Sequence, residues 1–339
     1  MRLTAPALIL SLAAPAFGQS TDLPLGGEPL PEAQEAPEQA PLTADAVNAA
    51  TYQGTPLPDG QSALTMKTQI LLDRAGVSPG VIDGHKGGMS ESALRGFEAR
   101  EGFVVDGLLD AEVWARLGGD TVGPVMMAYT IQPADAEGLV AAIPDNVREK
   151  AAMDRLGYTS LSEALAEQFH MDDDVLRAMN PQAAFEVGET VMVADPGLDQ
   201  QGEVARIEIR KSERRAVAFD ASGREISDYP VAIGSDETPS PEGALSVTAL
   251  APDPTYSYNP DVNFEADGVK EALILPPGPN GPVGSFWIDL SKPTYGLHGT
   301  DEPAKLFSQR SHGCVRFTNW DITELAAMVS EGVSVEFLP

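Results

Sequence analysis

The sequence predicts a multidomain protein whose largest part is a mainly-β sandwich or open barrel at the C-terminal end. Three observations favour this class. Alternating segments at 206–210 and 216–219 are followed by a Ser222-Gly223 turn, which is typical of a β-hairpin. Apolar residues recur at helical spacing between 61 and 120, which predicts a separate small helical domain. A chain of 339 residues also has room for two or three domains.

Residues 1–18 are typical of a cleavable signal peptide. Arg2 precedes an apolar run at 5–14, and Ala16-Phe17-Gly18 fits a small-x-small cleavage site. The apolar run is too short to span a bilayer, so a signal anchor is the less favoured alternative. No cysteine follows the site, which disfavours a lipid anchor. We therefore expect an exported protein of the periplasm or cell envelope without a membrane span.

Residues 19–60 are predicted to be a disordered, extended linker. They contain seven prolines, seven acidic residues and no lysine or arginine, so little apolar area offsets the chain entropy. The whole chain has a formal charge of −29. That charge disfavours nucleic acids and anionic membrane surfaces as partners. It is consistent with a soluble acidic surface and does not identify a partner.

Three short helices are predicted between 61 and 120. Their apolar positions are Met66, Ile70, Leu71, Leu94, Phe97, Val113, Trp114 and Leu117. The second helix is expected to open near Ser90 and the third near Asp110, with Asp-Gly turns at 83–84 and 106–107. The layout resembles the small three-helix peptidoglycan-binding domain, although the family's usual Phe-Gln pair is Phe97-Glu98 here. The resemblance implies wall binding, and a helical bundle without a ligand is the alternative.

Residues 125–197 resemble an α+β LysM-like region. They contain a predicted helix, a Met179-Asn180-Pro181 break and a strand at 187–193, although the segment 129–156 is longer than in a compact LysM. LysM modules bind glycans that contain N-acetylglucosamine, so the resemblance implies a second wall contact. His170 precedes the acidic run 172–174, which could suggest a metal site. That run instead predicts a capped helix start, so we expect His170 and His85 to be ordinary surface residues.

The lone cysteine, Cys314, lies in the segment 295–317 together with His298 and His312. A cysteine without a disulfide partner is either an inert buried side chain or a reactive thiol. Imidazole is the usual group that activates a thiol. Gly313 has no Cβ, so nearby backbone N–H groups can turn toward a developing oxyanion. The pattern predicts a cysteine nucleophile, and its spacing does not decide which histidine is the base.

A zinc site is the alternative for the same three side chains. His298, His312 and Cys314 suit zinc, but the sequence offers no apparent fourth ligand. We therefore expect neither a metal nor a cofactor.

The remaining elements of the C-terminal domain are predicted from alternation and capping. Strands are expected at 229–233, 245–249, 285–290 and 333–337. Thr318, with Asp321 three residues later, predicts the start of a helix. Ile322, Leu325, Ala326 and Val329 form its apolar stripe, and Gly332 is expected to end it. The cysteine loop should lie at one mouth of the sandwich or barrel.

A family resemblance joins these observations. His298-Gly299-Thr300 and, ten residues later, the run from Ser311 to Arg316 (SHGCVR) resemble the HGT…SHGCxR signature of L,D-transpeptidases with a YkuD-type catalytic domain. The resemblance extends over the expected catalytic domain, 203–339, and includes the segments 229–243 and 281–290. The segment PSPEG at 239–243 departs from the family's plainest TP.G form.

The resemblance implies a role for each matching residue. Cys314 would attack a peptide carbonyl and form a thioester, and His298 would be the base, with His312 as the second catalytic candidate. The other implied positions are the backbone donors Gly313 and Gly299 and the substrate-binding candidates Arg316, Ser311, Thr300 and Tyr295. For Arg316, a structural salt bridge that holds the cysteine loop is an equal alternative.

The implied reaction is acyl transfer on peptidoglycan. A tetrapeptide stem would lose its terminal D-Ala, and the amine of a neighbouring stem would complete a 3→3 cross-link. The partners would be peptidoglycan stem peptides and glycan. Water as the acceptor, giving an L,D-carboxypeptidase or cross-link hydrolase, and attachment of a wall protein remain open. A non-catalytic wall-binding protein is disfavoured, because binding alone needs no thiol nucleophile.

Overall fold

The computed structural model describes residues 42–260, 269–311 and 313–339. The predicted signal peptide, most of the predicted linker and His312 lie outside these residues. No helix within the described ranges is long and apolar enough to cross a membrane.

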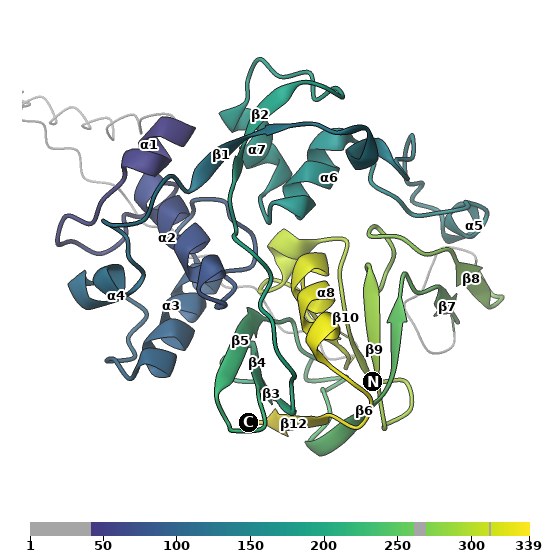
Figure 1. The fold of residues 1–339 in the computed structure, drawn as a ribbon. Coiled ribbons are helices and arrows are strands. Elements are labelled where there is room, and N and C mark those ends of the chain that lie inside the picture. The colour runs from purple at the N-terminus through teal and green to yellow at the C-terminus, as the bar shows by residue number, and fades with distance from the viewer. Residues whose placement is uncertain (1–41, 261–268, 312) are drawn as a thin grey trace, which may run out of the picture. The chain divides into compact units, whose positions relative to one another are not determined.

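The three predicted helices of the N-terminal domain are confirmed (Figure 1). They are α2 (Ala63–Arg74), α3 (Gly88–Glu101) and α4 (Ala111–Arg116). Asp110 caps α4 as expected, because its carboxylate accepts the N–H of Val113 at 2.8 Å. The helix α3 opens at Gly88, slightly before the predicted Ser90. Met66, Ile70, Leu94, Phe97 and Trp114 meet in one buried core.

The prediction of a disordered linker at 19–60 is wrong for the last part of that segment. Residues Ala44–Ala49 form α1, and the Val47 side chain is fully buried in the helical core. The ammonium group of Lys67 donates to the carbonyl oxygens of Asn48 and Ala50, at 3.3 and 2.8 Å. Composition does not predict this helix, because it is held in place by one buried valine and by the two hydrogen bonds from the Lys67 side chain on α2.

The middle region has an α+β arrangement. Its elements are β1 (Met126–Thr130), η1 (Pro133–Ala136), α5 (Val147–Ala151), α6 (Leu161–Gln168), α7 (Asp173–Met179) and β2 (Thr190–Ala194). The strands β1 and β2 pair in an antiparallel register, with Met126 opposite Ala194. Asp172 caps α7 as predicted, since its carboxylate accepts the N–H of Val175 at 3.1 Å.

The surface expectation for His170 is wrong, whereas the one for His85 is confirmed. The His170 side chain is 17% exposed, and its Nδ1 atom lies 2.7 Å from a carboxylate oxygen of Asp73 on α2. Its ring also stacks on Trp320, with centroids 5.2 Å apart. Both partners are remote in sequence, so local spacing could not reveal them.

The C-terminal region is one curled sheet of eight strands in the order β11-β10-β9-β6-β12-β3-β4-β5. The strands are β3 (Arg206–Arg210), β4 (Arg215–Phe219), β5 (Glu225–Pro230), β6 (Gly243–Pro252), β9 (Phe286–Leu290), β10 (Gly296–His298), β11 (Val315–Arg316) and β12 (Ser334–Leu338). Two short strands, β7 (Tyr256–Tyr258) and β8 (Leu273–Leu275), form a separate pair. The described residues of this region therefore form one curled sheet rather than a two-sheet sandwich.

The sheet closes on itself at the cysteine strand. The chain after β5 returns to β11, where Ala232 and Arg316 exchange two backbone hydrogen bonds of 2.9 Å. Ser311 and Ile233 add a third at 2.9 Å. This closure corresponds to the open barrel among the two predicted architectures.

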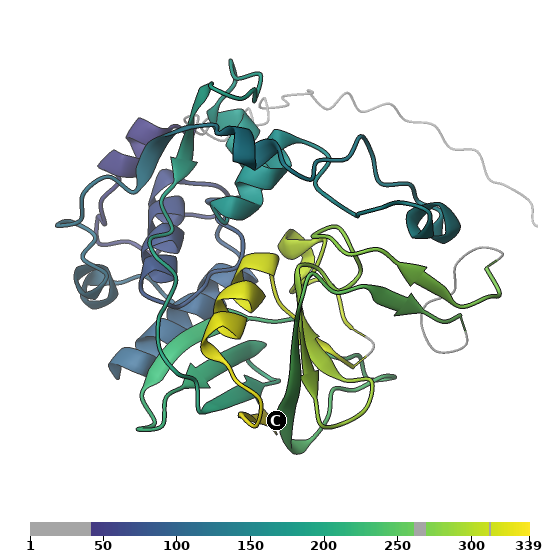
Figure 2. The same cartoon turned by 45° about the vertical axis from the view of Figure 1, so that its right-hand side comes forward.

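The helix α8 (Asn319–Met328) packs beside β9 and β10 and covers the sheet core (Figures 1 and 2). Thr318 caps it as predicted, because its hydroxyl accepts the N–H of Asp321 at 3.1 Å. The predicted stripe of Ile322, Leu325, Ala326 and Val329 is buried. The helix ends at Met328 rather than at Gly332, because Val329 already has extended backbone angles.

Candidate active site

The two halves of the sequence signature meet on neighbouring parallel strands. In the register of β10 and β11, Leu297 lies opposite Val315 and His298 lies opposite Arg316. Opposed residues of a parallel pair project to the same face, and residues two apart along a strand share that face. His298 and Arg316 are therefore directed to one face of the sheet, and Cys314 lies in the bend directly before β11.

His298 is held as a neutral imidazole. Its side chain is 5% exposed, and Nδ1 lies 2.7 Å from the carbonyl oxygen of Gly299. A carbonyl only accepts, so Nδ1 carries the hydrogen and the lone pair is on Nε2. The ring stacks on Trp287, with centroids 5.5 Å apart and planes 17° apart. Burial, together with the nearby Arg316 cation, lowers the pKa of His298 to about 3.

Cys314 is a protonated thiol at neutral pH. Burial raises the pKa of the Cys314 thiol, and the backbone N–H of Gly296 and the charge of Arg316 oppose that rise only partly. The sulfur also lies 3.5 Å from the carbonyl oxygen of Thr294, which is a long contact. This differs from the expectation that a neighbouring histidine lowers the thiol pKa. The pair is a neutral thiol and a neutral imidazole, so the nucleophile forms by proton transfer during the reaction.

Gly313 is required by the geometry of the cysteine loop. Its φ is 114°, and a Cβ there would come within 2.7 Å of the Tyr295 ring. Ser311 supports the same turn, because its hydroxyl donates to the carbonyl of Cys314 and accepts the N–H of Gly313 at 3.1 Å. The loop is thus closed by its own polar groups.

The two predicted oxyanion donors are already engaged. Gly313 donates its N–H to Ser311, and Gly299 donates its N–H to the carbonyl of Phe286 at 3.3 Å. This geometry does not support an oxyanion role for either group. It supports a role in shaping the loop and the strand.

The predicted substrate-binding residues divide into two kinds. Ser311 and Thr300 are each 3% exposed and bonded within their own turns, so the expectation that they contact substrate is not supported. Tyr295 packs against Gly313, and the Lys292 ammonium group lies 4.1 Å from its ring centroid. Tyr295 remains a candidate because it also borders a cavity.

Arg316 has unused hydrogen-bonding capacity. Its Nη1 donates to Gln309 at 3.3 Å, and its buried Nε has no partner among the described residues. Within residues 42–260, 269–311 and 313–339, no carboxylate lies in ion-pair range of its guanidinium. Among those residues Arg316 therefore makes no structural salt bridge, and part of its guanidinium remains available as a hydrogen-bond donor.

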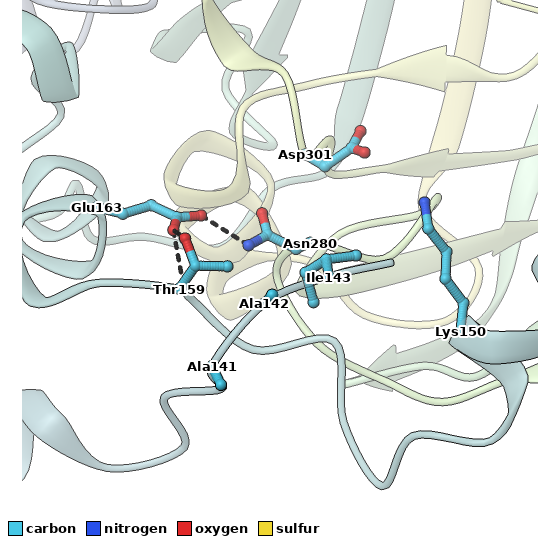
Figure 3. Close-up of a pocket in the computed structure, with 8 residues that line it drawn as sticks. All are labelled: Ala141, Ala142, Ile143, Lys150, Thr159, Glu163, Asn280 and Asp301. Atoms are coloured by element: carbon cyan, nitrogen blue, oxygen red, sulfur yellow. Dashed lines mark hydrogen bonds between the residues drawn. The ribbon is translucent and has the colours of Figure 1, made fainter. Parts of the chain in front are cut away.

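Two cavities lie beside the signature residues. One, of about 600 Å³, is lined by Tyr295, Lys292, Arg310, Lys211 and the segment 233–242 in part. The other, of about 590 Å³, is lined by Asp301, Lys150, Asn280, Glu163, Thr159 and Ala141–Ile143. Figure 3 shows Glu163 bonded to Thr159 and Asn280, with Asp301 and Lys150 on the side of the cavity away from Glu163.

Sequence reasoning missed or set aside several residues at the site. Tyr256, Trp287 and Asn319 are not among the residues assigned from the sequence. Burial, and then the nearby Cys314 thiol, raises the pKa of Tyr256, and Trp287 stacks on His298. The Asn319 side chain lies against Gly299. The nearest available signal for Asn319 was its place five residues after Cys314.

The zinc alternative depends on His312, which lies outside the described residues. Among the residues that are described, no group of three histidine, cysteine, aspartate or glutamate side chains could hold a metal ion.

Comparison with known proteins gives two family matches. Residues 204–336 match the family model for the L,D-transpeptidase catalytic domain, YkuD, and residues 62–117 match a "Putative peptidoglycan binding domain". A curated relative, "Putative L,D-transpeptidase YkuD" of Bacillus subtilis, is 28% identical over 51% of this chain and 90% of its own length. "Probable L,D-transpeptidase YcfS" of Escherichia coli is 24% identical over 52% of this chain and 58% of its own length.

Solved structures also match parts of the chain. An L,D-transpeptidase from Mycobacterium smegmatis is 16% identical, with a TM-score of 0.32, and the match covers 45% of this chain and 64% of that one. An L,D-transpeptidase from Xylanimonas cellulosilytica is 13% identical, with a TM-score of 0.39, covering 85% and 99%. The family match over 204–336 agrees with the position of the HGT and SHGCVR residues. Residues 204–336 are therefore an L,D-transpeptidase catalytic domain, and the chain is an enzyme of that type.

Proposed function

We propose that this enzyme cross-links peptidoglycan through a thioester on Cys314. The donor is a tetrapeptide stem that loses its terminal D-Ala, and the acceptor is the amine of a neighbouring stem, which yields a 3→3 link. The observation that carries the proposal is that His298 lies opposite Arg316 in the register of β10 and β11, with Cys314 in the bend directly before β11. A nucleophile, a base and a carboxylate-binding group are the parts that this acyl transfer needs.

The first half of the reaction forms the acyl-enzyme. Nε2 of His298 takes the thiol proton while the sulfur of Cys314 attacks the carbonyl carbon of the third stem residue. The tetrahedral intermediate then expels the D-Ala nitrogen, which receives the proton from the imidazolium. The S–C bond has formed and the C–N bond has broken, so one D-Ala leaves per thioester.

The second half transfers the acyl group. The acceptor amine gives a proton to His298 and attacks the thioester carbonyl, and the C–S bond breaks. The departing thiolate takes that proton back, which regenerates the neutral pair. Because Gly313 and Gly299 already use their N–H groups, we propose that the N–H of Cys314 itself faces the oxyanion.

Arg316 explains how a histidine with a pKa of about 3 can act as a base. The Arg316 cation is one of the two causes that lower the pKa of His298. A substrate carboxylate bound to Arg316 would offset that charge and favour the imidazolium. Proton transfer from Cys314 would then be favoured only when a donor stem occupies the site.

The accessory regions support a role at the cell wall. The family match over 62–117 supports glycan binding by the helical domain. The order β1, η1, α5, α6, α7, β2, with β1 paired to β2, supports our proposal that 125–197 is LysM-like. We further propose export to the periplasm or cell envelope, based on the signal-like residues 1–18. N-terminal sequencing of the mature protein from cell fractions tests the last point, and a start at residue 1 in the cytoplasmic fraction contradicts it.

Intact-protein mass spectrometry with a disaccharide-tetrapeptide tests the reaction. The wild type is expected to gain an acyl group that lacks D-Ala and to release 3→3 dimers, whereas Cys314→Ala gains nothing. Tripeptide product without dimers would instead identify a carboxypeptidase. A wild type that forms no adduct with the stem or with a carbapenem would contradict the proposed chemistry.

A further inference from the structure

A buried amide links the catalytic strand to the middle region. Asn319, the first residue of α8, is 3% exposed. Its Nδ2 donates to both carboxylate oxygens of Glu167, at 3.1 and 3.0 Å, and to the carbonyl of Pro279 at 3.2 Å. Its Oδ1 accepts the N–H of Ser285 at 3.0 Å. The amide therefore has a donor side and an acceptor side that are both occupied.

The acceptor side of this amide lies against the residue after His298. A Cβ added to Gly299 would come within 2.2 Å of the Asn319 Oδ1, and one added to Gly284 within 2.1 Å. Gly299 is the residue whose carbonyl oxygen receives the Nδ1 hydrogen of His298. The amide of Asn319 thus packs directly on the peptide that fixes the tautomer and ring orientation of His298.

Glu167 determines which way this amide faces. Turning the amide over would place its oxygen against the Glu167 carboxylate and its NH₂ group against the N–H of Ser285, so both contacts would become repulsive. Glu167 comes from α6, 152 positions before Asn319. It is itself oriented by the hydroxyl of Tyr158, which donates to it at 3.1 Å.

A second contact ties the same helix to the turn before β9. Glu163, one turn earlier on α6, accepts the Asn280 amide at 2.6 Å. The backbones of Leu156 and the turn also exchange bonds, from Leu156 N–H to Pro277 at 2.8 Å and from Asn280 N–H to Leu156 at 3.0 Å. Hydrogen bonds from the middle region therefore hold in place the segment that contains Pro279, Gly284 and Ser285.

We propose that Glu167 is a positioning residue for His298, acting through Asn319 and Gly299. The proposal rests on the proposed function, in which His298 is the base. It makes the middle region a structural part of the catalytic centre, in addition to any wall contact. Loss of the Glu167 carboxyl group releases the amide of Asn319, and the Gly299 carbonyl then no longer holds the imidazole in one tautomer.

The test compares variants of the full chain at Glu167 with a control at the neighbouring position. Glu167→Met removes the acceptor, Glu167→Gln keeps an acceptor oxygen, and Gln168→Ala alters the exposed neighbour on the same helix as the control. The rate of thioester formation with the disaccharide-tetrapeptide is followed by mass spectrometry, together with iodoacetamide alkylation of Cys314. We expect E167M to lower the rate of thioester formation at saturating substrate by about ten-fold or more with KM unchanged. We expect E167Q and Q168A to stay near the wild type.

Alkylation separates positioning from general damage. Iodoacetamide reacts with the small thiolate fraction that is in equilibrium with solvent, and Glu167 is not among the groups that shift the pKa of Cys314, so E167M should be alkylated at the wild-type rate. Folded E167M that forms the thioester like the wild type overturns the proposal, as does an equal loss in E167Q. If the wild type itself forms no thioester, the proposed function fails along with it.

A double-mutant cycle checks the route through Asn319. If Glu167 acts through that amide, E167M added to Asn319→Ala should lower the rate no further. Independent, multiplying losses would overturn the route. Glu167→Asp provides a second variant because its shorter side chain loses the same contact. A folded E167D with wild-type rate overturns the proposal even where E167M does not fold.

Discussion

The cysteine site and the junction between the sheet and the helical domain each contain an arginine, and these two arginines are bonded in opposite ways. At the site, Nε of Arg316 has no partner among the described residues. At the junction, Arg215 and Asp228 are each 2% exposed and bonded at 2.7 Å. Arg215 also donates to the carbonyl of Ser78 on the helical domain at 3.0 Å.

This contrast separates a polar side chain that is available to a substrate, Arg316, from one whose hydrogen bonds stabilise the fold, Arg215. A buried polar atom without a partner is costly, and in the proposed function a substrate carboxylate supplies the missing partner of Arg316. At the junction the Arg215 guanidinium is bonded to Asp228 and to the carbonyl oxygen of Ser78, so it joins Ser78 to β4 and β5, although the buried Ser227 hydroxyl nearby has no partner among the described residues. Changes at the site should affect chemistry, whereas changes at the junction should affect stability.

The largest expected effect comes from the base. Replacing His298 by Gln removes the Nε2 lone pair that takes the thiol proton, so thioester formation should fall by about 10²–10⁴-fold. Mass spectrometry with the tetrapeptide donor measures this, beside the exposed His85→Gln as control. Circular dichroism should be unchanged. A His298→Gln enzyme with near-normal rate would move the base to His312.

The next largest effect should appear at the junction. Arg215→Met leaves the Asp228 carboxylate buried without its cation, which should lower the free energy of unfolding by about 3–5 kcal/mol. Urea denaturation measures the loss, and the folded fraction should keep the wild-type rate of thioester formation. Arg224→Met is the matched control, because that arginine pairs with Asp220 while 71% exposed and should lose far less. Equal losses of unfolding free energy in Arg215→Met and Arg224→Met would show that the buried ion pair stabilises the fold no more than the exposed one.

The parts of the fold that the sequence could predict are those set by local chemistry. The capping residues Asp110, Asp172 and Thr318 each accept the expected N–H bond, because a cap involves residues three apart. The HGT and SHGCVR segments could be assigned to one site because each of them is an unbroken run of residues in the sequence. The neutral charge states of His298 and Cys314 could not be predicted, because they depend on the burial of these side chains, which the sequence does not show.

The parts that could not be predicted involve long separations. Glu167 and Asn319 are 152 positions apart, and His170 and Asp73 are 97 apart. Each of these residues looked like an ordinary helix-terminal or surface residue in its own segment. Packing between regions, rather than periodicity within one, decides which polar side chains become buried. The bridge from Ala232 to Arg316 that closes the sheet likewise joins residues far apart in the sequence, so it could not be predicted either.

Asp321 should make the junction weaken as the pH rises. Burial raises its pKa from 3.8 to about 8, while Ser78 donates to it at 3.0 Å. The folded state then holds a proton that the unfolded state has lost, so stability falls between about pH 4 and pH 8, by at most about 1.4 kcal/mol per pH unit. The pKa of His170 is also raised, by Asp73, and contributes in the same direction. Asp321→Asn should flatten the decline in unfolding free energy between pH 5 and pH 8.

The matched control for that slope is Glu331→Gln, which changes an exposed carboxylate. It should leave the pH dependence of unfolding as in the wild type. If Asp321→Asn keeps the full wild-type slope, the proton is held elsewhere, with Glu324 as the nearest remaining carboxyl group whose pKa burial raises.

The smallest expected effect is on the reactivity of the free thiol. Because the pKa of Cys314 is raised above 9.0, iodoacetamide should alkylate it slowly at pH 7, and the rate should rise mainly above pH 9. Arg316→Met removes a cation that favours the thiolate, so alkylation at pH 8 should slow further, by about a few-fold. Lys292→Met, which alters only the cation over Tyr295, is the control. An alkylation rate that rises between pH 5 and pH 7 would instead show a preformed thiolate–imidazolium pair, and the site would then hold buried charge as the junction does.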